Sequence, residues 1–256
     1  MKSLLILTFI SSTLTFAIPA VRAADNTLTD AEKAAGWKLL FDGKTLDGWH
    51  NFKKPGVKPG WQVKDDTLAC VDPHNAGDIV TEGNYGAFEL QIDFKMGPGA
   101  NSGIMYHVTE EGGAAWATGP EIQLEDNAKA ADPQKCGWLY ALYKPADDKA
   151  TGKPLDATKP AGEWNHLRVV ISPKGCLHEM NGVKYVEYVI GSDEFNQRVA
   201  ASKFGKMPSS PRPTAARSPC KATTEKYPSG ISRFARSREP SSREDRAFLA
   251  SRRCAG

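Results

Sequence analysis

The sequence predicts an all-β protein, built as an antiparallel β-sandwich, and two observations carry this prediction. In the stretch 86–96 apolar residues alternate with polar ones, which places one face of a strand in a core and the other in water. From Gly36 onward, short apolar runs recur between clusters of turn residues, a pattern typical of a sandwich. Helical periodicity is scarce, and 256 residues are enough for one sizeable core.

The predicted strands follow one another at short intervals. They lie at 37–41, 61–63, 67–71, 86–96, 103–108, 121–125, 139–143, 164–172, 176–180 and 184–190. Asn181 and Gly182 form the strongest two-residue hairpin signal, between the last two strands. One capped helical turn is predicted at 29–33, a short surface helix at 192–203 and a long loop at 144–162.

The first 23 residues have the pattern of a secretory signal peptide. Lys2 precedes a short apolar run that hydroxyl residues interrupt, and a small-residue cleavage site ends at Ala23. The run is too short and too hydroxylated for a membrane span. We therefore expect a secreted or periplasmic protein with no membrane contact after the signal is removed. Its five cysteines have no metal-type spacing.

Residues 209–256 differ in composition from residues 24–208. The 24–208 part carries 18 Lys and 2 Arg against 26 acidic residues, whereas the tail carries 2 Lys and 9 Arg against 4. Few large apolar residues occur in the tail, so it is predicted to be disordered. A basic tail often binds nucleic acid. Here the inversion from Lys to Arg indicates instead a one-base frame change near Pro208, and no nucleic-acid partner is expected.

The genetic code supports this interpretation. When the last base of each codon joins the first two of the next, residues 217–225 can encode IALQGDHG, and the segment up to Phe234 can encode EVSFRNIKI. These strings alternate like two strands joined by a turn. The predicted organisation is a signal peptide at 1–23, an incomplete β-sandwich at 24–208 and an out-of-frame, disordered basic tail at 209–256. A genuine disordered tail is the alternative. Without its closing strands this chain is expected to fold poorly or to be inactive.

Five short motifs occur in the order found in a known family. They are GWKLLFDGKTLDGW at 36–49, NSGI at 101–104, EIQLEDN at 121–127, GEWN at 162–165 and the Asn181-Gly182 turn. On these motifs residues 36–208 resemble the 3-keto-disaccharide hydrolase domain family, and the family's closing strands resemble the regrouped codons. The resemblance implies a concanavalin A-like jelly-roll β-sandwich that acts on oxidised sugars.

The resemblance also implies a chemistry. A ketone at C3 of a sugar acidifies the C2 proton, so its removal expels the glycosidic oxygen from C1, and water then adds to the enone. Such an enzyme depends on a sugar 3-oxidoreductase to make the ketone. No cofactor is predicted. A divalent metal site is neither predicted nor excluded, because Glu121, Asp126 and His107 could be ligands but have no diagnostic spacing.

The leading candidate residues lie on the predicted strand 121–125. Glu121, Gln123 and Glu125 alternate with Ile122 and Leu124, so the polar three line one face of the strand. Carboxylates and amides in a row can hold sugar hydroxyls and move protons. Glu121 is the first candidate acid or base, and Gln123 is a candidate for orienting a hydroxyl. An ordinary solvated face is the competing interpretation.

Two further residues are candidates for catalysis. Asp126 holds the acidic position of the family motif and is preferred over Glu125 as the second acid. His107, near the end of the predicted strand 103–108, could act as base, acid or enolate stabiliser, because imidazole titrates near neutral pH. A single histidine on a strand is more often structural.

Four residues are candidates for substrate binding. Asn101 could bond sugar hydroxyls or simply form a turn. Trp138 and Tyr140 alternate around Leu139 and could stack on a sugar ring or belong to the core. Lys144, at the start of the long loop, could stabilise an enolate or remain solvated.

Two other functions fit the same predicted fold. A laminarinase-like glucanase would use two catalytic carboxylates on an E-x-D-x-E strand, but Gln123 stands where the middle aspartate would be. A non-catalytic carbohydrate-binding module is the other alternative, because fold does not fix function.

Overall fold

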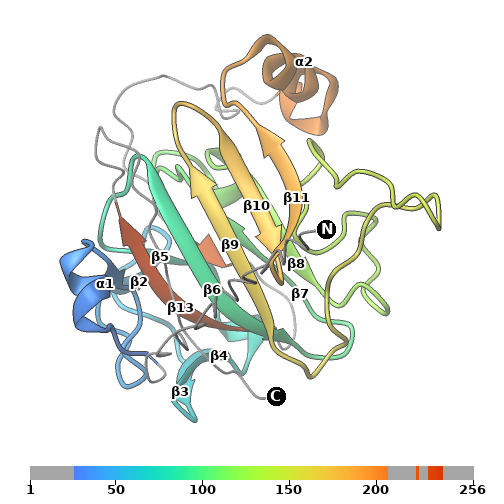
Figure 1. Ribbon diagram of the computed structural model, residues 1–256. Coiled ribbons are helices and arrows are strands. Elements are labelled where there is room, and N and C mark those ends of the chain that lie inside the picture. The colour runs from blue at the N-terminus through green and yellow to red at the C-terminus, as the bar shows by residue number, and fades with distance from the viewer. Residues whose placement is uncertain (1–25, 207–222, 225–229, 239–256) are drawn as a thin grey trace, which may run out of the picture.

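The computed structural model describes residues 26–206, 223–224 and 230–238. These residues form two antiparallel sheets, one of eight strands and one of five, with few helices. In Figure 1 the larger sheet lies in front of the smaller one, with α1 (Asp30–Ala34) and α2 (Asp193–Ala201) at its margins. The predicted all-β, concanavalin A-like jelly-roll sandwich is confirmed.

The eight strands of the larger sheet are β1 (Lys38–Leu39), β3 (Trp61–Lys64), β4 (Thr67–Cys70), β6 (Phe88–Met96), β9 (Asn165–Ile171), β10 (Cys176–Met180), β11 (Val183–Tyr188) and β13 (Gly230–Arg238). Their order is β11-β10-β9-β6-β13-β4-β3, with β1 also paired to β13. The smaller sheet comprises β2 (Trp49–Asn51), β5 (Ile79–Thr81), β7 (Asn101–Met105), β8 (Glu121–Glu125) and β12 (Thr223–Thr224). Its order is β2-β5-β12-β7-β8, which puts β8 at one edge.

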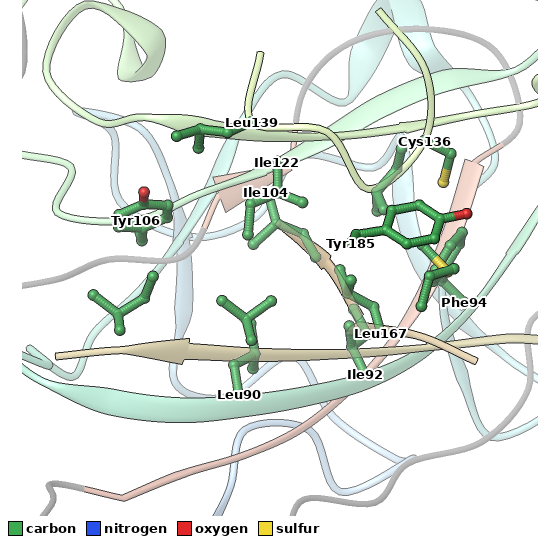
Figure 2. Close-up of a cluster of buried hydrophobic side chains, with 14 of the residues drawn as sticks. Leu90, Ile92, Phe94, Ile104, Tyr106, Ile122, Cys136, Leu139, Leu167 and Tyr185 are labelled. Atoms are coloured by element: carbon green, nitrogen blue, oxygen red, sulfur yellow. The ribbon is translucent and has the colours of Figure 1, made fainter. Parts of the chain in front are cut away.

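The hydrophobic core lies between the two sheets. Leu90 and Ile92 of β6 meet Ile104 of β7 and Ile122 of β8, and each is at most 2% exposed (Figure 2). These are the residues that alternation in the sequence assigns to the inner faces. Burying one such side chain contributes about 1.5–3 kcal/mol, so the alternation is the main determinant of the sandwich.

The outer face of β6 is not in water, contrary to the sequence-based expectation. Glu89 and Asp93 are each only 7% exposed. Asp93 lies 2.7 Å from Nδ1 of His166, and Arg168 bonds both Glu89 and Glu179, the latter at 2.6 Å. The alternation shows which side chains are polar, but pairing with the neighbouring strands β9 and β10 is what lets them be buried.

The segment 139–143 is not a strand, although its apolar character predicts one. Leu139 forms only isolated bridges to Ile122 and Tyr143, and Ala141 adopts a positive φ of 57°, which a continuous strand does not allow. Two short strands that were not predicted, β2 and β5, form the edge of the smaller sheet opposite β8. Each has three residues, too few to show a period.

The turns and helix ends that local residue patterns predict are found in the structure. Asn181 and Gly182 have φ values of 51° and 81°, as a type I′ hairpin between β10 and β11 requires. Thr29 and Glu32 form a capping box, with their reciprocal bonds at 3.2 and 2.6 Å. The predicted helical turn and the predicted surface helix are thus found as α1 and α2.

The C-terminal tail contributes two described segments, β12 and β13, and both are strands. β12 pairs with β5 and β7, and β13 pairs with β6 and β4, in the middle of the larger sheet. The rest of the tail and the predicted signal peptide at 1–23 lie outside the described residues. No helix in the described part of the chain is long and apolar enough to cross a membrane.

Candidate active site

Strand β8 is held on both sides by backbone hydrogen bonds. On one side it pairs with β7, so that Met105 lies opposite Glu121 and Asn101 opposite Glu125. On the other side the segment after Cys136 closes the edge: Gln123 N–H donates to the Trp138 carbonyl (3.0 Å), and Tyr140 N–H donates to the Glu121 carbonyl (2.9 Å). Residues 121, 123 and 125 therefore share a fixed row on the outer face of the smaller sheet.

Gln123 and Glu125 lie beneath the segment 132–138 and not at a solvated surface. Gln123 is fully buried and donates to the Gln134 carbonyl at 3.2 Å. Glu125 is 2% exposed and bonds Lys135 Nζ at 2.6 Å. Burial raises the pKa of Glu125, and the bond from Lys135 opposes this rise. These two side chains fasten the segment to β8, so Gln123 is not placed to meet a sugar hydroxyl in this conformation.

Glu121 is the least buried residue of the row and lies across the neighbouring strand. A Cβ placed on Gly103 of β7 would lie 2.8 Å from Glu121 Cγ and 2.9 Å from its Cδ, closer than any real side chain allows. The carboxylate thus occupies the space that the missing side chain leaves, over the middle of the sheet face. Of the three polar residues on β8, Glu121 is the one whose position suits an acid or base.

Asp126 is engaged by the backbone through both carboxylate oxygens. Oδ2 accepts from Gly99 N–H at 2.8 Å, and Oδ1 accepts from Ala128 N–H at 3.1 Å. Asp126 N–H in turn donates to the Ala100 carbonyl at 2.9 Å. This bonding joins the end of β8 to the turn that precedes β7, and so positions the half-buried Asn101. The geometry gives Asp126 a supporting role beside Asn101.

His107 lies just beyond β7 with a positive φ of 55°. Its Nε2 is 2.9 Å from the Gly86 carbonyl, and its ring meets Tyr106 edge to face at 5.4 Å. Burial lowers the pKa of His107, while the bond to the Gly86 carbonyl opposes the shift. Tyr106 N–H donates to the Pro120 carbonyl at 3.2 Å. His107 and Glu121 therefore lie at the same end of the β7–β8 pair, and His107 remains a candidate acid or base.

The three candidates from 138–144 are largely engaged by protein groups. Tyr140 donates its hydroxyl to Asp132 Oδ2 at 2.7 Å, and Lys203 Nζ lies 4.2 Å from its ring centroid. Lys144 is exposed and pairs with Asp147 at 3.0 Å. Trp138 is half-buried and is fixed through its backbone carbonyl. The ring of Tyr140 is thus covered by a cation, which leaves Trp138 as the more available aromatic of the pair.

Sequence reasoning missed Trp116 and did not favour His50 as a site residue. Trp116 is exposed on a short 3-10 turn, η2 (Ala115–Ala117), in the loop between β7 and β8. His50 of β2 has Nδ1 2.8 Å from Glu82 and Nε2 3.0 Å from Glu110, at the rim of an open hollow. A single Trp in a run of Gly and Ala was the signal for Trp116. His50 had none, because Glu82 and Glu110 are distant in sequence.

No three metal-ligating side chains gather into a metal-binding group anywhere in the described ranges. Glu121, Asp126 and His107 are accordingly not brought together as a ligand set. Asp126 is bonded to backbone N–H groups and His107 to a backbone carbonyl, as described above.

Comparison with known proteins decides the family. A family model described as the 3-keto-alpha-glucoside-1,2-lyase-like domain matches residues 36–216. The chain belongs to this family. It is 28% identical over 195 residues to the 3-keto-disaccharide hydrolase of Bacteroides thetaiotaomicron, and this match covers 68% of the chain but only 65% of that relative.

Two solved structures from Parabacteroides distasonis, both of candidate glycosyl hydrolases, have the same fold. One is 32% identical with a TM-score of 0.72, and the match covers 84% of this chain and 98% of that one. The other is 26% identical with a TM-score of 0.56, covering 80% and 99%. Together with the family, these relatives support a carbohydrate hydrolase.

Proposed function

We propose that this protein cleaves the glycosidic bond of 3-keto-disaccharides, or of related oxidised glycosides, by elimination followed by hydration. Membership of the family and the similarity to a 3-keto-disaccharide hydrolase support the substrate class. The observation that carries the mechanism is the position of the Glu121 carboxylate over Gly103, on the outer face of the smaller sheet. Such a substrate requires an oxidoreductase that first oxidises the sugar at C3.

The reaction is written with Glu121 as the base. Its carboxylate takes the C2 proton, which the C3 ketone makes acidic. The electron pair of that C–H bond forms the C1–C2 double bond, and the C1–O bond breaks. The departing oxygen takes a proton, for which His107 at the same end of the β7–β8 pair is the candidate donor. Water then adds across the double bond, with oxygen at C1 and hydrogen at C2, to give the free 3-keto sugar.

Replacing Glu121 by Gln tests the assignment. Glutamine keeps the shape and the hydrogen-bonding capacity but cannot accept the C2 proton. We expect kcat on a 3-keto-disaccharide to fall by about a hundredfold or more while binding is kept. Turnover of the unmodified disaccharide by the original protein would instead favour a glucanase. Binding without any turnover would favour a carbohydrate-binding module.

Isotope incorporation tests the elimination step itself. Cleavage in heavy water should place one deuterium at C2 of the released 3-keto sugar, because that hydrogen is lost to the base and returned from solvent. The released 3-keto sugar, incubated in heavy water without enzyme, corrects for spontaneous exchange. Product that retains its original C2 hydrogen would rule out the elimination and leave direct hydrolysis.

A further inference from the structure

Trp116 stands apart from the other tryptophans of the chain. All six lie within the described residues, and Trp116 is the only one of the six that is exposed, at 40%. Trp37, Trp49 and Trp61 are at most 5% exposed. Tryptophan carries a large apolar surface that normally packs inside, so an indole held in solvent indicates a surface that contacts something else.

The loop that carries Trp116 is fastened at its base. Thr118 Oγ1 accepts from Thr109 N–H and donates to the Thr109 carbonyl, both at 3.0 Å, which closes the loop. Ala115 is fully buried in a small cluster with Met105 and Val108. The indole is therefore presented by an ordered turn, so little conformational entropy is lost when a ligand contacts it.

The position of this turn links Trp116 to Glu121. Ala115, which directly precedes Trp116, lies in a buried cluster with Met105, and Met105 lies opposite Glu121 in the β7–β8 pair. Residues directly opposite in an antiparallel pair project from the same face of the sheet. The turn that carries Trp116 is thus anchored on the face of the smaller sheet from which Glu121 projects.

We propose that Trp116 is the stacking platform for a pyranose ring of the substrate whose C2 proton Glu121 removes. This inference rests on the proposed function and adds to it a residue that fixes the sugar's orientation. A pyranose ring has an apolar face of C–H groups and a polar edge of hydroxyls, which matches an indole surface beside a carboxylate. Stacking on Trp116 would set the ring face, and hence the C2–H bond, toward Glu121.

The test compares Trp116→Ala and Trp116→Phe with the original protein. The variants are made in the 256-residue chain and also in its one-base-corrected product. Binding of a 3-keto-disaccharide and of its unoxidised parent is measured by calorimetry, with turnover and melting temperature alongside. We expect Trp116→Ala to weaken binding and raise KM about tenfold, and also to lower kcat because the ring is no longer oriented toward Glu121, with the melting temperature nearly unchanged; Trp116→Phe should restore most of the loss.

Trp164→Ala is the matched control, because Trp164 is a half-buried tryptophan that directly precedes β9 of the other sheet, with Lys95 Nζ 5.2 Å from its ring centroid. Its loss should leave sugar binding unchanged. Sugar binding that survives Trp116→Ala overturns the platform and leaves the proposed function intact. If neither the 256-residue chain nor its one-base-corrected product binds either sugar, both the stacking platform and the proposed function are overturned. Loss of self-association or of a protein contact in Trp116→Ala, with sugar affinity unchanged, would show a protein-binding surface instead.

Discussion

At the scale of single residues, the missing side chain of Gly103 is what gives Glu121 its place. The Glu121 carboxylate fills the space where a Cβ would stand. Gly103 belongs to the NSGI motif on β7, and Glu121 begins the EIQLEDN motif on β8. The two motifs thus depend on each other: the glycine of NSGI leaves the space that the first glutamate of EIQLEDN fills.

Replacing Gly103 by Ala should therefore impair the reaction. The added methyl group must displace Glu121, which we expect to lower kcat by about tenfold to a hundredfold and to destabilise the fold by about 1–3 kcal/mol. Gly113→Ala is the control, because a Cβ at Gly113 meets no atom within 4 Å. Steady-state kinetics and urea unfolding measure the two effects. Full activity in Gly103→Ala would mean that the position of Glu121 is not critical.

At the scale of elements, a buried polar chain ties β10 and β11 to the segments around the other sheet. His178 of β10 is fully buried, with Nε2 3.0 Å from the Tyr188 hydroxyl and Nδ1 3.1 Å from the Gly137 carbonyl. The Tyr188 hydroxyl is also 2.5 Å from that of Tyr106. Gly137 lies in the segment that closes the edge of β8, so this chain supports the candidate site from beneath.

This arrangement makes stability depend on pH. Burial lowers the pKa of His178 from 6.5 to about 4. Between these values the unfolded chain binds a proton that the folded chain does not, so the free energy of unfolding falls as the pH drops from about 6.5 to 4. The contribution is at most about 3 kcal/mol.

Urea unfolding at pH 7 and pH 4.5 measures this dependence. His178→Asn should lose stability at pH 7 and show a flatter pH dependence in this range, because the titrating group is gone. His74→Asn, at an exposed histidine, should keep the original slope. An unchanged slope in His178→Asn would assign the acid sensitivity to other groups.

At the scale of the whole molecule, the larger sheet depends on a strand from the tail. β13 separates β6 from β4, and its register sets Gly230 opposite Met96, Ser232 opposite Phe94 and Ser237 opposite Leu90. Central sandwich strands normally carry apolar residues at positions opposite the core. In the given reading frame three of the four residues opposite core positions are small or polar, and Phe234, opposite Ile92, is the one large apolar residue, whereas the regrouped codons encode an alternating string. We propose on this ground that a one-base frame change lies near Pro208.

Comparing the 256-residue chain with its one-base-corrected product tests this proposal. We expect the corrected protein to melt cooperatively and at a higher temperature, and to carry the activity, because the regrouped codons supply its closing strands with more apolar residues for the core. Sequencing of the DNA across the codons of Pro208 and Ser209 gives an independent result. A cooperative melt and full activity in the 256-residue chain would contradict the frame change.

The sequence predicted most of the sandwich but only part of the candidate site. Alternation identified β6, β8 and β9, because period-two burial leaves a direct record in residue order. Residue alternation gave no signal for the three-residue strands β2 and β5. It also wrongly predicted a strand at 139–143, where Ala141 has a positive φ. At the site the sequence pointed to Glu121, but the prediction that Gln123 orients a sugar hydroxyl could not take account of the segment 132–138, which packs over it.

What the sequence determined by itself is which side chains can share a face, because strand geometry fixes alternation, and turn and cap signals act over two to four residues. Only the tertiary structure decided which of those faces are open. Contacts with other segments of the chain bury Gln123 and Glu125, occupy Asp126 and Tyr140, and leave Glu121 over Gly103. Such contacts depend on three-dimensional packing, and residue order does not encode them locally.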